Sequence, residues 1–179
     1  MSLAYFHHPD ASGLAVGGTA VLEGPEGHHA AVVRRIAVGE QVVLTDGAGV
    51  VARVRVAEVG KGSLQAEVLD VASLPAESPR VVVVQAVPKG ERGELAVEML
   101  TEVGVDVIVP WTAARSVSRW RGERAEKGLA KWRSAAREAA KQSRRSWFPE
   151  VRPLAEEGGR SESENGQIVF RLRDSFRSR

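Results

Sequence analysis

The sequence contains no cysteine, which excludes disulfide bonds and thiolate metal ligands. It also lacks any apolar run near the roughly 18 residues that a membrane-spanning helix needs. The N-terminus, "MSLAYFHHPDASG", has no basic segment followed by an apolar one, so we expect no signal peptide. No internal repeat is present. These absences favour a globular protein of a reducing compartment, and we predict a cytoplasmic location and no membrane partner.

An excess of positive over negative charge is lacking outside one segment of the chain. The net charge is only +2, but residues 111–152 hold 12 Lys and Arg against 4 Asp and Glu. The same segment contains all the tryptophans, at positions 111, 120, 132 and 147. Such a segment predicts a polyanionic partner, most simply nucleic acid. A solvated helix face is the alternative, but it is usually mixed in charge rather than basic.

Residues 1–72 have the pattern of a small β module. The stretch "DGAG" at 46–49 predicts a tight hairpin, and residues 50–56 alternate apolar positions with Arg53 and Arg55. Short strands, glycine turns and one small helix predict a compact barrel. The stretch "SLPAESP" at 73–79 has two prolines and no periodicity, so we interpret it as a linker.

After the linker the pattern changes to that of an α/β domain. "RVVVVQAV" and "VDVIVP" are continuous apolar runs, typical of strands buried on both faces. The stretch between them predicts a helix that ends at Gly104. Strand, helix and strand form a βαβ unit with a right-handed crossover. We expect one apolar face on this helix, made of Leu95, Ala96, Met99, Leu100 and Val103.

A long helix is predicted from Glu123 to about Arg145. Its apolar side gathers Leu129, Trp132, Ala136, Ala139 and Ala140. Cations beside that side predict contacts with RNA phosphates, made by Arg133, Arg137, Lys141 and Arg144. Arg145 shares a separate face with Glu138 and Gln142, which we predict to lie at the RNA or domain interface. Trp120 is the best candidate for stacking on a base, whereas Trp132 is expected in the core. Further on, "QIVFRLR" predicts one short strand.

Several motifs occur in order along this region: "KGERGELAVEMLTEVGVDVIVP", "ARSV" and "EAAKQSRRSWFPEV". On these residues the chain resembles the ribosomal RNA small subunit methyltransferase E family, of the SPOUT class. The resemblance implies a PUA-like N-terminal β-barrel that binds RNA, followed by an α/β domain with a trefoil knot. It also implies S-adenosylmethionine as cofactor, a homodimer, and methylation of uridine N3 in 16S ribosomal RNA of the small ribosomal subunit.

The sequence departs from this family after Pro153. The family's methyl-donor loops are a "GPEGG"-like turn that follows a strand and a segment that completes the knot, and neither motif is found there. We therefore expect a PUA-like barrel at 1–72, a linker at 73–79, and a SPOUT-like domain at 80–179 that is truncated or divergent after 153. We also expect this chain to bind S-adenosylmethionine far more weakly than a complete family member.

Two alternatives to an active methyltransferase remain. One is a catalytically inactive RNA-binding protein that retains the barrel and the basic helix. The other is a generic nucleotide-binding α/β protein, which would need a phosphate loop after the first buried strand. "PKGERGE" lacks the spacing of such a loop.

The stretch "GPEGHH" at 24–29 suggests three chemistries. Glycine and proline are typical of a cofactor loop, but no buried parallel strand is predicted before it. Adjacent histidines in a helix point about 100° apart, so we predict no metal site. By resemblance the region lies in the RNA-binding module, which makes His28, His29, Arg34 and Arg35 candidate RNA contacts. The alternative is a turn that starts a helix.

Methylation at uridine N3 requires loss of a proton, so the site must stabilise an anion or accept that proton. By resemblance, Glu102 faces the region where substrate enters, and the alternative is an exposed carboxylate near a helix C-terminus. Arg115 follows the second buried strand, at the edge of a parallel sheet where ligands bind. The alternative for Arg115 is a solvated surface position. We predict both as catalytic residues.

Overall fold

The computed structural model describes residues 3–90, 92–112, 120–156 and 168–170. The chain divides into two compact units, Met1–Ala76 with Lys141–Trp147, and Glu77–Ala140 with Phe148–Arg179. The expected boundaries at 72 and 80 did not anticipate that residues 141–147 group with the first unit. Among the described residues, no helix is both long enough and apolar enough to cross a membrane.

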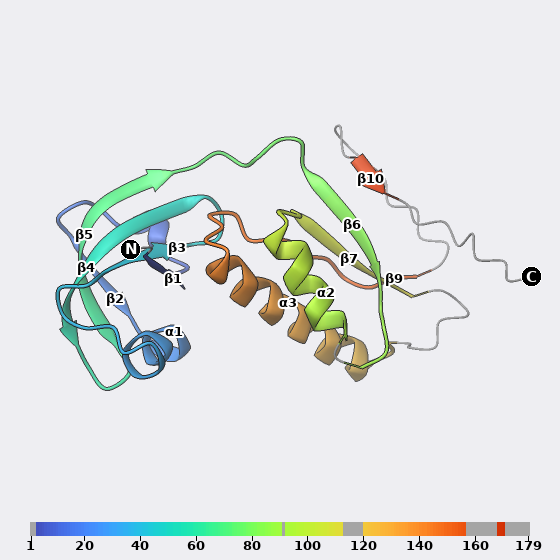
Figure 1. Ribbon diagram of the computed structural model, residues 1–179, viewed down its shortest axis with the longest axis horizontal. Coiled ribbons are helices and arrows are strands. Elements are labelled where there is room, and N and C mark those ends of the chain that lie inside the picture. The colour runs from blue at the N-terminus through green and yellow to red at the C-terminus, as the bar shows by residue number, and fades with distance from the viewer. Residues whose placement is uncertain (1–2, 91, 113–119, 157–167, 171–179) are drawn as a thin grey trace, which may run out of the picture. The chain divides into compact units, whose positions relative to one another are not determined.

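A five-stranded sheet with the order β1-β3-β4-β5-β2 forms the first unit (Figure 1). Strand β1 runs parallel to β3, and the other neighbours are antiparallel. Because β1 and β2 are the two edges, the compact barrel that we expected takes the form of a curled half-barrel. Its elements are β1 (Ala4–His7), η1 (Ala11–Gly13), β2 (Thr19–Leu22), α1 (Gly24–His28), η2 (His29–Val33), β3 (Gln41–Thr45), β4 (Val50–Val59) and β5 (Leu64–Ser73).

The predicted hairpin between β3 and β4 is confirmed. Asp46 Oδ1 accepts hydrogen bonds from the backbone N–H groups of Ala48 at 2.7 Å and Val50 at 3.0 Å. Gly47 and Gly49 have φ angles of 73° and 103°, in the region that favours glycine. The carboxylate and the two glycines together fix this turn.

Burial along β4 alternates as predicted, with Arg53 and Arg55 exposed and their neighbours inside. The inward side chains form one apolar core with those of the other strands. Its larger members are Phe6, Leu22, Val42, Leu44, Val54, Val56, Leu64 and Val68. All members of this core lie within the first unit.

The second unit contains a parallel sheet with the order β10-β6-β7-β8, and β9 also pairs with β7 (Figure 1). The predicted βαβ unit is confirmed as β6, α2 and β7. The tail stretch around 168–170 lies beside β6, as an edge strand. The elements are β6 (Val81–Ala86), α2 (Arg92–Glu102), β7 (Val107–Thr112), α3 (Glu123–Gln142), β8 (Glu150–Val151), β9 (Ala155–Glu156) and β10 (Ile168–Phe170).

The prediction for the apolar face of α2 is wrong. The helix instead buries Gly93, Val97 and Thr101, and Leu100 packs at the margin of the core. Trp132 explains why this face of α2 is buried, because a Cβ at Gly93 would lie only 2.7 Å from the Nε1 atom of Trp132. The smallest residue of the helix therefore faces the large indole. Three of the residues predicted to be buried point outward, with exposed fractions of 56, 58 and 77%: Leu95, Met99 and Val103.

The apolar face of α3 follows the prediction. Trp132 and Ala136 belong to the core of the second unit, and Leu129 packs against it. The helix ends at Gln142, a little before the predicted end. Arg144 then adopts a φ of 58°, which turns the chain out of the helix. Gly104 also ends α2 as predicted, with a φ of 96°.

Candidate nucleic-acid interface

The stretch "GPEGHH" starts a helix. Helix α1 begins at Gly24 with Pro25 in its first turn, where a missing N–H costs nothing. The preceding strand β2 is antiparallel to β5, so no parallel strand leads into this turn. A Cβ at Gly27 would lie 2.4 Å from the carbonyl oxygen of Leu22, so only glycine fits there. The cofactor-loop interpretation of this stretch therefore has no structural support.

Glu26 is the residue in this stretch whose role the sequence did not reveal. Its Oε2 accepts a hydrogen bond from the backbone N–H of His7 at 3.1 Å, and its Oε1 lies 2.5 Å from Lys141 Nζ. The side chains of Glu26 and Lys141 are 19% and 4% exposed. The pair ties residues 141–147 into the first unit. Since Lys141 is buried against a carboxylate, its ammonium is not available to a phosphate, and the predicted RNA contact at this position loses its basis.

A cavity of about 80 Å³ in the first unit is lined by four of the predicted RNA contacts, one of which is the paired Lys141. His29, Arg34 and Arg144 line it, with Tyr5 and Phe6 from β1. The imidazole of His29 meets the ring of Phe6 edge-on, with centroids 5.9 Å apart and planes at 77°. This contact holds His29 in place, while Arg34 and Arg144 stay exposed. Two guanidinium groups around a small hollow suit an anion such as an RNA phosphate.

The other two candidates of the first unit are exposed but do not line this cavity. They are His28 and Arg35. Arg35 has a φ of 54°, and among the described residues Arg144 is the only other non-glycine residue in that region. Such a backbone conformation costs about 1–2 kcal/mol for an ordinary side chain. Strain of this kind often marks functional positions, and Arg144 is the one beside the cavity.

The predicted RNA-binding arginines of α3 and of the turn after it differ in their contacts. Arg133 Nε donates a hydrogen bond to the carbonyl oxygen of Val151 at 3.2 Å, which ties the helix to β8. Arg137 is exposed, and its side chain makes no hydrogen bond or ion pair with any residue that the structure describes. Arg145 is half-buried. Of these three, Arg137 is best placed to meet a phosphate.

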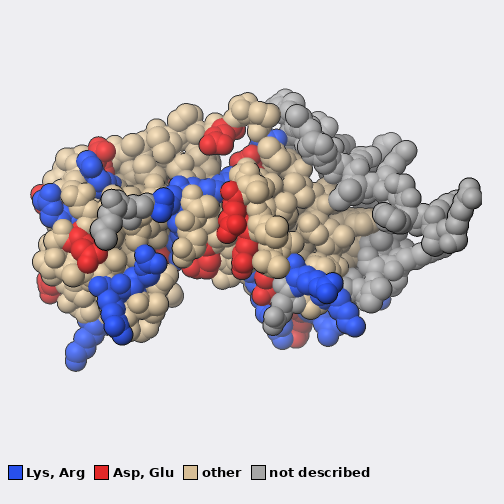
Figure 2. Space-filling model, in the orientation of Figure 1, with Lys and Arg blue, Asp and Glu red and all other residues tan. Residues whose placement is uncertain are grey.

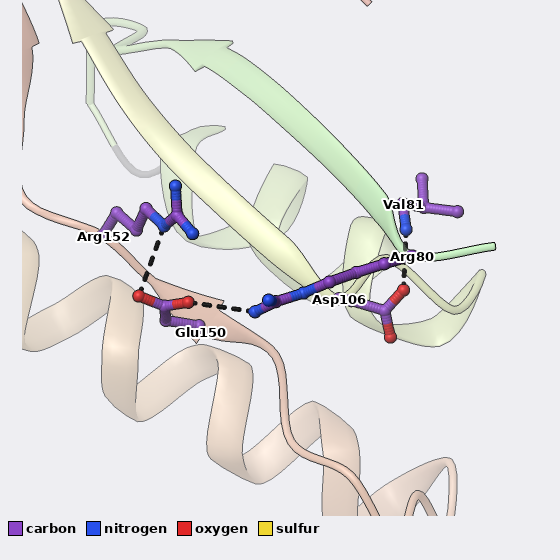
Figure 3. Close-up of polar contacts among 5 residues, drawn as sticks. All are labelled: Arg80, Val81, Asp106, Glu150 and Arg152. Carbon is purple, nitrogen blue, oxygen red and sulfur yellow. Dashed lines mark hydrogen bonds and ion pairs between the residues drawn. The ribbon is translucent and has the colours of Figure 1, made fainter. Parts of the chain in front are cut away.

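The "FPEV" motif has a structural role in the second unit. Glu150 lies between two guanidinium groups, with its Oε2 3.1 Å from Arg80 and its Oε1 3.3 Å from Arg152 (Figure 3). Beside it, Asp106 Oδ2 accepts a hydrogen bond from the backbone N–H of Val81 at 2.8 Å (Figure 3). These contacts join the first residues of β6, β7 and β8.

The two predicted catalytic residues are not brought to one site by the described structure. Arg115 lies outside the described residues. Glu102 is exposed in the last turn of α2, and the chain continues from there into the amino end of β7. Ligands of parallel sheets bind at the opposite, carboxyl edge, so this placement gives Glu102 no neighbour that supports catalysis.

A second cavity, of about 490 Å³, opens at the carboxyl end of β6. Trp120 and Trp132 meet edge to face in its wall, with ring centroids 5.1 Å apart. Four cations that the sequence did not single out also line it: Lys89, Arg124, Lys127 and Lys131. Figure 2 shows Lys and Arg side chains gathered over the beginning of α3. Trp120, predicted as a stacking residue, was the available signal for this pocket.

No group of three or more His, Cys, Asp or Glu residues is placed to hold a metal ion within the ranges that the structure describes.

Two family models match the chain. The RNA methyltransferase PUA domain matches residues 22–69, and the RNA methyltransferase domain matches residues 76–170. A protein of Mycobacterium bovis named ribosomal RNA small subunit methyltransferase E is 53% identical over 135 residues, which cover 75% of this chain and 52% of the relative. A protein of the same name from Bacillus subtilis is 31% identical over 131 residues, covering 73% and 51%. The chain thus spans about half the length of these curated relatives.

Solved structures agree with this match. A ribosomal RNA small subunit methyltransferase E from Neisseria gonorrhoeae, bound to S-adenosyl methionine, has a TM-score of 0.76 at 31% identity and covers 86% of this chain and 62% of its own. A methyltransferase from Legionella pneumophila in complex with its cofactor SAM has a TM-score of 0.77 at 26% identity, covering 87% and 64%. The chain therefore belongs to the RNA methyltransferase family that includes the proteins named ribosomal RNA small subunit methyltransferase E.

Proposed function

We propose that this protein transfers a methyl group from S-adenosylmethionine to N3 of a uridine in 16S ribosomal RNA. The observation that carries the proposal is the 53% identity over 135 residues to the Mycobacterium bovis protein named ribosomal RNA small subunit methyltransferase E. The match of a PUA domain supports RNA as the substrate. A cytoplasmic location is part of the proposal, in keeping with the absence of cysteine.

In this proposal the first unit holds the RNA backbone. Arg34 and Arg144 meet a phosphate at the small cavity, and His29 contacts the same strand. Arg137 belongs to the second unit, and we propose it as a separate phosphate contact there. These groups fix the register of the RNA without reading its bases. His28 and Arg35 contribute positive potential or hydrogen bonds nearby.

The chemical step requires that the uridine N3 proton leave before or during methyl transfer. A guanidinium close to the base oxygens stabilises the resulting anion, and we propose Arg115 for this role. Glu102 is the proposed proton acceptor, although its place at the end of α2 gives it less support. The methylation rate of Glu102→Gln and of Arg115→Gln, measured as a function of pH, distinguishes the two roles.

The methyl donor supplies a methyl group on a positively charged sulfur. Two structural neighbours hold this donor, which supports it as the cofactor. The large pocket of the second unit fits it poorly, because four cations line that pocket and its one carboxylate, Glu94, already lies 3.7 Å from Lys131. We therefore assign no described residue to donor binding, and we expect calorimetry to give a dissociation constant weaker than micromolar. Micromolar binding would contradict that expectation.

Mass spectrometry of the RNA product tests the function directly. Small ribosomal subunits that lack the modification are incubated with the chain and a large excess of S-adenosylmethionine. We expect 3-methyluridine at a single position of 16S ribosomal RNA, and none without the donor. RNA binding without any methylated product would favour the inactive RNA-binding protein instead.

We also propose a homodimer and a SPOUT-type knotted domain, as the resemblance implies. An exposed apolar stripe supports the dimer, because large apolar side chains in a row favour burial against another surface. The stripe consists of Leu95 and Met99 on α2 and Val103 just after it. Sedimentation tests it. Leu95→Glu with Met99→Glu is expected to give monomers, while Glu98→Gln on the same helix stays dimeric. A monomeric unaltered chain would contradict the dimer.

A further inference from the structure

The large pocket of the second unit has no role in the function proposed above. Three segments form it: residues 87–90 after β6, the start of α2, and the beginning of α3 with Trp120. It lies at the carboxyl end of β6, the edge where open parallel sheets bind their ligands. Its volume of about 490 Å³ is in the range of small-ligand sites.

The charge of the pocket wall favours an anion. Lys127 Nζ lies 3.5 Å from Glu123 Oε2, and Lys131 pairs with Glu94, so these two lysines are partly neutralised. Lys89 and Arg124 are exposed, and their side chains have no ion pair or hydrogen bond with any residue in the described ranges. Two positive charges therefore remain available at the rim of the pocket.

The pocket also offers an aromatic surface. Two glycines allow the indoles to come close, since a Cβ at Gly128 would lie 2.5 Å from Trp120 Cε2, and one at Gly93 would lie 2.7 Å from Trp132 Nε1. Trp132 is buried and Trp120 is half-buried, so Trp120 is the ring with surface left to present. Aromatic rings beside cations are the combination that proteins use to bind single-stranded nucleic acid.

We infer that this pocket receives one nucleotide of a single-stranded RNA segment, with its phosphate between Lys89 and Arg124 and its base against Trp120. The inference rests on the proposed RNA substrate, and it adds a specific binding site to it. A pocket of about 490 Å³ admits a single nucleotide but not a duplex. The cations that disfavour a sulfonium ligand favour a phosphate, so the same wall that fits the methyl donor poorly fits RNA well.

Titration of a labelled oligouridylate of about ten nucleotides with the full chain tests the inference, with anisotropy measured at several salt concentrations. Lys89→Ala with Arg124→Ala should weaken binding about tenfold and reduce the magnitude of the log–log salt slope by about 1.4. The matched control removes two exposed cations of the first unit, Lys61→Ala with Arg53→Ala, and should change affinity less than about twofold. RNA should also quench tryptophan emission, and Trp120→Phe should remove most of that quenching.

Three outcomes separate this inference from the proposed function. Equal losses in the pocket variant and the control would overturn the pocket as a nucleotide site and leave the methyltransferase proposal standing. A loss of RNA affinity in the pocket variant but not in the control would support the pocket as a nucleotide site. If no 3-methyluridine formed in the product assay, the methyltransferase proposal would be wrong while the pocket proposal stood. An unaltered chain that binds no RNA would overturn both.

Discussion

The two ends of α3 carry the same residue type in opposite roles. Near the start of the helix, Lys127 is 78% exposed and lies 3.5 Å from Glu123, also on the surface. At the other end, Lys141 is 4% exposed and lies 2.5 Å from Glu26, a residue 115 positions away. The first lysine faces solvent beside a pocket, and the second holds the first unit together.

This difference shows that a basic stripe on a helix is not one functional surface. An exposed ion pair contributes little to stability, because water and salt screen it. A buried pair leaves an uncompensated charge if one partner is removed. The same substitution at the two lysines is therefore expected to change stability by different amounts, and the predictions below run from the largest expected effect to the smallest.

Lys141→Met should have the largest effect on stability. It leaves the Glu26 carboxylate largely buried without its cation, and we expect a loss of about 3 kcal/mol in the free energy of unfolding. Urea melts followed by tryptophan emission measure it. Lys127→Met is the matched control on the same helix, with an expected change within about 0.5 kcal/mol. Equal free energies of unfolding for Lys141→Met and Lys127→Met would contradict the difference between the buried and the exposed ion pair.

Gly27→Ala should cost somewhat less, about 2 kcal/mol, because its Cβ meets the backbone carbonyl of Leu22 and the helix must shift. Gly13→Ala is the control, since a Cβ there meets no atom within 4 Å and the glycine has no positive φ. Thermal melts of both variants show whether close packing around α1 limits the first unit. A Gly27→Ala protein as stable as the Gly13→Ala protein would contradict the close approach seen here.

Arg80→Ala should have the smallest effect, within about 0.5 kcal/mol, because its ion pair with Glu150 is exposed. Glu150 also keeps Arg152 as a partner, 3.3 Å away. The same urea melts measure this variant. A loss as large as that of Lys141→Met would show that the exposed pairs of Figure 3 hold the sheet as strongly as the buried pair holds the first unit.

The local sequence pattern predicted most of the helices and strands. It succeeded where the residues of one short segment determine the structure of that segment. The hairpin at 46–49, the alternation along β4 and the apolar face of α3 all follow from nearby residues. The face of α2 could not be predicted in this way. Its burial depends on Trp132, about forty positions beyond Gly93, over which it packs.

The candidate site was predicted only in part, for a similar reason. His29 and Arg34 come from one stretch, and both line the small cavity. The Glu26–Lys141 pair joins residues with no common motif, so it becomes visible only in three dimensions. The nucleotide pocket combines a loop after β6 with the start of α3, and of its members only Trp120 was predicted from the sequence to contact RNA.

The salt dependence of RNA binding tests the central claim most directly, namely that exposed cations bind RNA while Lys141 serves the fold. The slope of log K against log salt for the unaltered chain should be about −3 to −4. Arg34→Gln with Arg144→Asn, where asparagine tolerates the left-handed backbone, should reduce its magnitude by about 1.4. Lys141→Met, measured below its melting temperature, should leave the slope unchanged. A slope that flattens with Lys141→Met but not with the arginine variant would contradict the account.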